Sequence, residues 1–261
     1  MRAPRLFNPA IMLLLPILST WKRFRFFVQM LDRVSHGVDT EHYRWLGKVT
    51  VVGILEAIHR VSDGEAAAFL SDYFVERDYT GSHFESIGAQ AGTEDVFTAA
   101  DLYSVSTLSV EVPPRAGIAM LGDEAPEFNG LLEQVPNVAI GALSESEFEK
   151  HLGLDSKAME LWDLLRRNRP GDIKWDIGPT TASKILARKR PHLIPIEDSV
   201  VNRVIDLGRG DSWRLWWEAF HADGDNLEER ATKLRAEIGR PELSTLRVFD
   251  VMLWMWGKAN A

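Results

Sequence analysis

The chain has 261 residues, of which 45% are hydrophobic and 26% are charged, a composition typical of a globular protein and not of a disordered one. It contains no cysteine, which excludes disulfide bonds, thiolate metal sites and iron–sulfur clusters. The net charge of −8 argues against a protein that coats nucleic acid non-specifically.

The first 40 residues are expected to form an N-terminal extension outside the fold, before a helical domain over residues 41–261. The extension carries basic residues but no acidic residue before Asp32, and its apolar stretch, residues 10–18, is too short to span a bilayer. A signal peptide, an anchor and a start placed too far upstream remain alternatives, although no small-residue cleavage site follows. We expect a cytoplasmic protein with no membrane association.

The rest of the chain has the apolar spacing and the start and stop residues of helices. The pattern of residues 45–61 is compatible with a strand or a helix, and residues 79–84 are typical of a turn or short hairpin. Helices are expected over residues 63–74, 98–108, 115–121, 126–134, 144–152, 156–168, 199–207, 212–222, 226–238 and 244–258, with another beginning at Pro179. The fold class is therefore mainly α, arranged as one helical bundle or as two helical lobes.

Capping residues support two of these helix starts. Ser144 stands three residues before Glu147, the spacing of a capping box, and Ser156 stands four before Glu160, a looser match.

Residues 156–207 form the most informative unit of the sequence. The helix over residues 156–168 is broken by Arg169-Pro170-Gly171, and Gly178 permits a tight turn before Pro179 opens the next helix. Free backbone N–H groups at the start of that helix, at the positive end of its dipole, make a natural phosphate site.

This stretch resembles the helix-hairpin-helix motif of DNA glycosylases, which has the form hydrophobic-Gly-hydrophobic-Gly-x-x-Thr-Ala. The matching residues are Ile177, Gly178, Thr181 and Ala182. Asp176 replaces the first glycine and places a negative charge near a bound phosphate. The superfamily continues with apolar-Pro-x-x-Asp-x-x-Val, which matches residues 194–201 here and puts Asp198 eighteen residues after Thr180, the superfamily's spacing.

The resemblance implies a glycosylase-like helical fold and a catalytic role for Asp198, which would stabilise positive charge on a deoxyribose or activate water. Thr180 stands where the bifunctional enzymes have lysine, so no Schiff base and no lyase activity is expected. If the protein is an enzyme, it is then a monofunctional DNA N-glycosylase that takes a base out of the stack. No cofactor is implied.

Asp198 also has a structural interpretation, because aspartate is a good N-cap for the helix that follows it. The functional interpretation requires that Asp198 and the turn at Gly178 share one groove of nucleotide size.

DNA is the expected partner because residues 164–214 contain eleven basic and six acidic residues, a local charge of +5 within an acidic chain. The expected DNA-binding residues are Lys174, Ile177, Gly178, Thr180, Thr181, Lys184, Arg188, Lys189 and Arg190. No metal site is expected, since no histidine pair has ligand spacing with a carboxylate. Trp213, Trp216 and Trp217 have a spacing that favours core packing over a stacking platform for bases.

A second resemblance covers residues 61–258. The stretches 79–85, 97–102, 187–191 and 246–256 are similar to an uncharacterised bacterial family, which implies one continuous architecture and no particular activity. The competing functional hypothesis is a noncatalytic interaction or structural module that keeps the hairpin as a scaffold. The acidic net charge and Asp176 favour it.

Overall fold

The computed structural model describes residues 53–77, 79–207 and 211–261. The expectations for the extension over residues 1–40, and for residues 41–52, lie outside this part of the chain. The described residues form helices joined by turns and contain no strand, so the mainly α fold class is confirmed. Within the same residues, no helix has both the length and the hydrophobicity to span a bilayer.

The helices follow the predicted order closely. Residues 53–60 are helical, and the elements after them are α3 (Asp63–Ser71), η2 (Asp72–Glu76), η3 (Thr80–His83), α4 (Ala99–Ser106), α5 (Pro114–Leu121), α6 (Ala125–Leu132), η4 (Ile140–Ala142), α7 (Glu145–Leu152), α8 (Lys157–Leu165), α9 (Pro179–Lys189), α10 (Ser199–Val204), α11 (Ser212–Glu237) and α12 (Thr245–Ala259).

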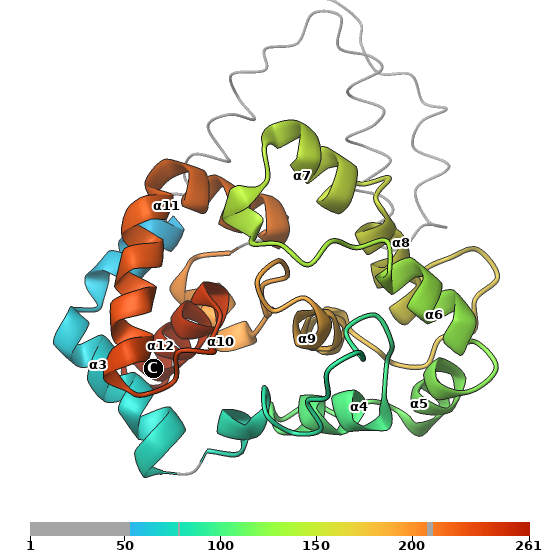
Figure 1. The fold of residues 1–261 in the computed structure, drawn as a ribbon, viewed down its shortest axis with the longest axis horizontal. Coiled ribbons are helices and arrows are strands. Elements are labelled where there is room, and N and C mark those ends of the chain that lie inside the picture. Colours follow the sequence, from blue (N-terminus) through green and yellow to red (C-terminus); the bar gives the residue numbers. More distant parts are fainter. Residues whose placement is uncertain (1–52, 78, 208–210) are drawn as a thin grey trace, which may run out of the picture. The chain divides into compact units, whose positions relative to one another are not determined.

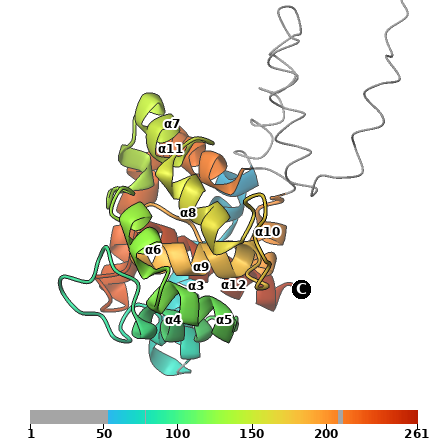
Figure 2. The same cartoon turned by 90° about the vertical axis from the view of Figure 1, so that its right-hand side faces the viewer.

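Helix α9 occupies the middle of this arrangement. Figure 1 shows α3, α10, α11 and α12 to the left of α9, with α5, α6 and α8 to its right and α4 below it. Figure 2 views the molecule from the right-hand side, with α8 above α9 and with α4 and α5 below it. Helices α4 and α8 pack against α9, and the Glu197 N–H joins the segment before α10 to Ser183 of α9.

Local capping explains most of the helix boundaries. The Ser144 side chain accepts a hydrogen bond from the Glu147 N–H, and the Glu147 carboxylate accepts one from the Ser144 N–H at 2.9 Å, so the predicted capping box is confirmed. Ser156 caps α8 through the Met159 N–H at 3.1 Å. Caps of this kind contribute about 1 kcal/mol each.

Two local expectations are refined. Of the turn and the short hairpin considered for residues 79–84, the structure has a turn, the single-turn helix η3. The helices expected over residues 212–222 and 226–238 are the two parts of α11, which are separated by a kink at Asp223, where φ is −148° and ψ is 29°. A glycine follows directly at residue 224, so the interruption lies where helix propensity is lowest.

The apolar faces of all these helices meet in one contiguous core. The two lobes considered from the sequence therefore do not have separate cores. Trp213, Trp216 and Trp217 are all buried in it, which confirms the packing interpretation. The Trp217 Nε1–H donates to the Leu143 carbonyl at 2.7 Å, so its one polar group is satisfied inside the core.

Helices α10 and α12 approach each other closely at Gly257. A Cβ atom at this position would lie 2.6 Å from the Val200 side chain and 2.7 Å from the Val204 side chain. Because glycine has no side chain, the two backbones pack together, and the first residues of α10 are held against α12.

Arg190, at the end of α9, is one of the most buried side chains of the protein, with 1% of its surface exposed. Its guanidinium donates to the carbonyls of Val135 and Leu132, both at 2.7 Å, and to that of Glu94 at 2.9 Å. It also pairs with Asp95. One side chain thus joins α9 to the end of α6 and to the segment before α4.

We predict that Arg190→Ala lowers the free energy of unfolding by about 3–5 kcal/mol, because it leaves buried carbonyls and a carboxylate without their donor. Urea denaturation measures the change. The exposed Arg203 is the control, and Arg203→Ala is expected to change stability by less than about 0.5 kcal/mol. Equal urea midpoints for the two variants would contradict the structural role of Arg190.

Candidate functional site

The predicted hairpin consists of α8, residues 166–178 and α9. Trp175 joins the connecting segment to the end of α8, because its Nε1–H donates to the Leu165 carbonyl at 2.6 Å. The Arg167 guanidinium lies over the Trp175 ring, 3.7 Å from its centroid. The segment is therefore held at its middle by an indole that is itself buried.

The turn before α9 differs from the sequence expectation. Gly178 has an ordinary φ of −82°, and the residue in the left-handed region is Asp176, with φ 66°. Aspartate tolerates this region better than most side chains do, so Asp176 makes the turn that a glycine would otherwise make. A Cβ atom at Gly178 would meet nothing within 4 Å, so its surroundings are open.

Five expected DNA-binding residues lie in this turn or beside it. Gly178, Thr180 and Thr181 are half-buried, and Ile177 is buried with 5% of its surface exposed. Lys174 is exposed, and its ammonium donates to the Asn168 side chain at 2.7 Å and to the Arg166 carbonyl at 3.2 Å.

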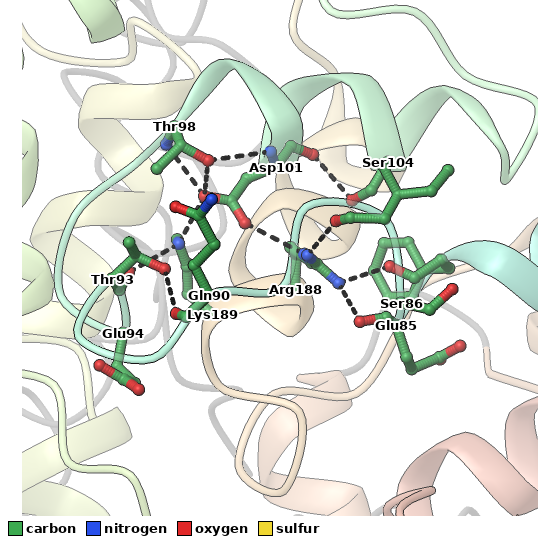
Figure 3. A network of polar contacts seen from close by, with 12 residues as sticks. Glu85, Ser86, Gln90, Thr93, Glu94, Thr98, Asp101, Ser104, Arg188 and Lys189 are labelled. Atoms are coloured by element: carbon green, nitrogen blue, oxygen red, sulfur yellow. Dashed lines mark hydrogen bonds and ion pairs between the residues drawn. The ribbon is translucent and has the colours of Figure 1, made fainter.

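The basic run at the end of α9 lies inside the protein (Figure 3). The Arg188 guanidinium donates to the carbonyls of Phe84 and Glu85, both at 2.6 Å, and to Asp101 at 3.0 Å. The Lys189 ammonium donates to the Thr93 carbonyl at 2.9 Å and pairs with the other oxygen of Asp101.

The placement of these side chains corrects the predicted DNA contacts. Arg188 and Lys189 have side chains only 7% and 4% exposed, and Arg190 is buried at the end of the same helix. Their donors are used by carbonyls and carboxylates of this chain, so phosphate oxygens have no access to them in this structure. In this structure the run joins α9 to the segments around α4 and after α6.

The expected basic face is also missing among the described residues. Most cations of residues 164–214 pair with carboxylates of the acidic remainder of the chain. These pairs are Arg167–Glu124, Arg169–Glu127, Arg188–Asp101, Lys189–Asp101, Arg190–Asp95 and Arg214–Glu149. The local excess of +5 is therefore largely neutralised within the protein.

Asp101 is the shared counter-ion of this internal network. Burial alone would raise the pKa of Asp101, but the hydrogen bonds from Lys189 and Thr98 outweigh it and hold the pKa below its ordinary value. The carboxylate also caps α4, since its Oδ2 accepts from the Thr98 N–H at 2.9 Å.

Asp198 combines the two roles weighed from the sequence. Its Oδ1 accepts from the Val200 N–H at 2.9 Å and caps α10. Its Oδ2 lies 3.4 Å from the Lys184 ammonium, and its side chain remains 20% exposed. Capping therefore occupies one oxygen, and the other faces the Lys184 ammonium.

Lys184 was expected to contact DNA, but the structure buries it with 3% of its surface exposed. Its ammonium donates to the Leu108 carbonyl at 2.9 Å and faces Asp198. The left-handed φ of 59° at Ser109 turns the chain directly after this carbonyl. Lys184 is thus an internal partner of the predicted catalytic carboxylate.

Asp198 opens into a cavity of about 120 Å³. Residues of η2, η3, the end of α4, α9 and α12 line it together with the segment before α10. Its aromatic walls are Tyr73, Tyr79 and Trp254. The two tyrosine rings stack at 5.1 Å, and Trp254 meets each of them edge-on at 6.0 Å.

The polar floor of the cavity includes two residues of α12. Arg247, 5% exposed, donates to Asp250 Oδ2 and Glu85 Oε1, both at 2.6 Å. It also donates to the Gly81 carbonyl at 2.8 Å and to the Tyr73 hydroxyl at 3.3 Å. Burial alone would lower the pKa of Arg247, but the surrounding Glu85, Tyr73 and Asp250 raise it, so the guanidinium is charged.

Sequence reasoning missed Arg247, Asp250 and the aromatic walls. The available signal was a charged pair three residues apart inside the otherwise apolar run 246–256. Such a pair lies on one face of a helix and is costly to bury unless it has partners.

The turn and the carboxylate are close but do not share one groove. The Glu197 N–H donates to the Ser183 hydroxyl at 2.9 Å, which fixes the segment before Asp198 against α9. The cavity lining contains Lys184 but no residue of the turn at 176–178, contrary to the requirement set from the sequence. Gly178 and Lys184 are six residues apart, about 9 Å along a helix.

Among the described residues, no three histidine or acidic side chains are grouped so that they hold a metal ion. The carboxylates of the cavity are instead interleaved with Lys184 and Arg247. The chemistry available there is therefore that of proton transfer and charge stabilisation around aromatic rings.

We predict that Asp101→Asn destabilises the protein by about 3–5 kcal/mol near neutral pH, because two buried cations lose their counter-ion. The folded-state pKa of Asp101 is depressed, so its stabilisation is complete above its unfolded value, about 3.9, and is lost as the pH falls through the folded value. Urea denaturation from about pH 7 to about pH 2 measures this.

The difference in stability between Asp101→Asn and wild type is expected to shrink as the solution becomes acidic. The exposed Asp155 provides the control, since Asp155→Asn removes one carboxylate without removing a buried counter-ion. A difference that stays constant with pH would contradict the assignment.

A protein family model described as a family of unknown function (DUF6308) matches residues 66–257, and the chain belongs to this family. The resemblance over residues 61–258 to an uncharacterised family is thereby confirmed. No curated protein and no solved structure matches the chain. The resemblance to the helix-hairpin-helix DNA glycosylases stays a prediction from residues 176–201.

Proposed function

We propose that this member of a family of unknown function is a monofunctional DNA N-glycosylase. It would bind DNA and release one base from it. The observation that carries the proposal is the position of Asp198, which lines a small cavity with aromatic walls. A base that leaves the stack needs a pocket of this kind, in which its faces meet aromatic rings.

Asp198 supplies the charge for this chemistry. Its Oδ1 accepts from the Val200 N–H and its Oδ2 lies 3.4 Å from the Lys184 ammonium, so both oxygens are held in place. A carboxylate oriented before the reaction stabilises the positive charge that develops on the sugar. The C1′–N bond breaks with its electron pair on the base nitrogen, water adds its oxygen to C1′, and a proton from that water ends on the base.

Lyase chemistry is not part of the proposal. Thr180 has no amine, and the Lys184 amine is already engaged by the Leu108 carbonyl and by Asp198. A buried amine that is held by these partners is a poor nucleophile.

The turn before α9 is the proposed contact for the DNA backbone. The first N–H groups of a helix have no partner within it, and Gly178 leaves the space above the turn open. The turn lies about one and a half helical turns from the cavity, a distance that suits a phosphate next to a base in the pocket. The exposed Lys174 lies in the segment before it.

We predict weak DNA binding with a shallow salt dependence, because few cations remain at the surface near the turn. Fluorescence anisotropy of a labelled duplex between about 50 mM and about 200 mM salt measures the affinity. Lys174→Glu is expected to weaken binding and to reduce the slope of log K against log salt by about 1.

Lys150→Glu is the matched control, since Lys150 is exposed on α7 away from the turn. Binding that is absent at the lowest salt, or equally sensitive to both variants, would remove the proposed contact.

We predict that Asp198→Asn abolishes base release while the fold is retained, because asparagine caps a helix about as well as aspartate but carries no charge. The assay uses duplexes that each carry one altered base: uracil, hypoxanthine, an alkylated adenine or an oxidised guanine. Thermal melting of the variant checks that α10 remains folded.

A wild-type protein that releases none of these bases would contradict the proposed chemistry. Release that persists in Asp198→Asn would assign the chemistry to another group.

A second candidate is a noncatalytic structural or interaction module. The specific observation that favours it is the internal use of Arg188, Lys189 and Arg190, together with a carboxylate at Asp176 on the turn. Neither DNA binding nor base release is expected from such a module, so the two experiments above separate the candidates.

A further inference from the structure

We infer that Asp250 is a second catalytic carboxyl group of the cavity, the group that exchanges a proton with the departing base while Asp198 faces the sugar. This inference rests on the proposed base release and assigns the proton transfer within it.

The position of Asp250 is the first argument. It lies on α12 with 8% of its surface exposed, and it lines the same cavity as Asp198, which lies at the start of α10. Its Oδ2 accepts from Arg247 Nη1 at 2.6 Å, and its Oδ1 has no hydrogen-bond partner among the described residues. A carboxyl oxygen on the lining of a cavity that accepts no hydrogen bond from the protein is available to a ligand.

The different surroundings of the two carboxyl groups are the second argument. Asp198 receives a backbone N–H and faces an ammonium. Burial raises the pKa of Asp250 to about 6, and the nearby Asp198 adds to the rise, against the opposing effects of Arg247 and Lys184. Two carboxyl groups whose environments differ in this way divide the roles of anion and proton donor between them.

The charges around Asp250 are the third argument. Four titratable or charged groups in the described part of the chain face Asp250. They are Arg247 on the same helix, Lys184 on α9, Asp198 at the start of α10 and Tyr73 on η2. Glu85 binds the far side of Arg247. Three carboxyl groups therefore share two cations, and one proton on Asp250 makes the cluster neutral.

The proposed step transfers one proton from Asp250 to the departing base. Protonated Asp250 gives its proton to the base nitrogen as the C1′–N bond breaks, and the bonding electron pair leaves with the base. The water that adds to C1′ returns a proton to Asp250. Arg247 holds the transient Asp250 carboxylate and keeps its own place through Glu85 and the Gly81 carbonyl.

The first test needs no DNA. Carbon-13 NMR of the carboxyl groups is expected to show Asp250 titrating near pH 6 in the wild-type protein. The signal is absent in Asp250→Asn. Its titration moves to lower pH in Asp198→Asn, because the neighbouring negative charge is removed. An Asp250 signal that titrates below about pH 5, or that ignores Asp198→Asn, overturns the inference.

Glu197 is the matched control. Burial, with Asp211 adding to it, raises the pKa of Glu197 to about 7, but its side chain does not line the cavity. Glu197→Gln therefore removes a second group that titrates in this range and leaves the Asp250 signal in place.

The second test follows single-turnover base release from about pH 5 to about pH 8, on the duplex that the wild-type protein cleaves. The wild-type rate is expected to fall above about pH 6, and Asp250→Asn to be slower by about 10²–10⁴-fold with a flat profile. Glu197→Gln keeps the wild-type profile. If Asp250→Asn does not fold, the wild-type profile and the first test decide the matter.

The outcomes separate this inference from the function on which it rests. Base release by Asp250→Asn at the wild-type rate and with the wild-type profile overturns the role of Asp250 and leaves the proposed function in place. No release from any duplex overturns both.

Discussion

Buried cations on α9 must find partners within the protein, because an unpaired charge in apolar surroundings costs several kcal/mol. Lys184, Arg188, Lys189 and Arg190 are all buried or nearly so, and each is satisfied by carbonyls and a carboxylate. Their partners lie in the segments around α4 and after α6, so these segments are held to α9 by polar contacts as well as by the core. The position of α9 in the middle of the domain follows from this constraint.

The same constraint shapes the cavity. Lys184 faces Asp198, and Arg247 joins Asp250 to Glu85, so the charges alternate beneath the aromatic rings. Arg247 holds this cluster together, because its guanidinium donates to Asp250, to Glu85 and to the Gly81 carbonyl. A preorganised set of charges beside a small pocket is suited to a reaction in which positive charge develops.

The sequence was sufficient for the helices and their starts, because those depend on neighbours three or four residues away, as at Ser144 and Glu147. It was not sufficient for Arg188, whose partners lie about a hundred residues earlier in the chain, near Phe84. Basic residues in a row have the same local pattern on a DNA-binding face and in an internal network. Only the fold shows that Asp101 lies beside them, and that the pair Arg247 and Asp250 faces Asp198.

Gly257 has a consequence for the distance between the two acidic groups of the cavity. Asp198 stands at the head of α10, Asp250 lies two turns before Gly257 on α12, and the two helices touch where that glycine lacks a side chain. Any larger residue there would act as a wedge and tilt one helix axis against the other. The distance between the two carboxyl groups therefore depends on a residue that does not line the pocket.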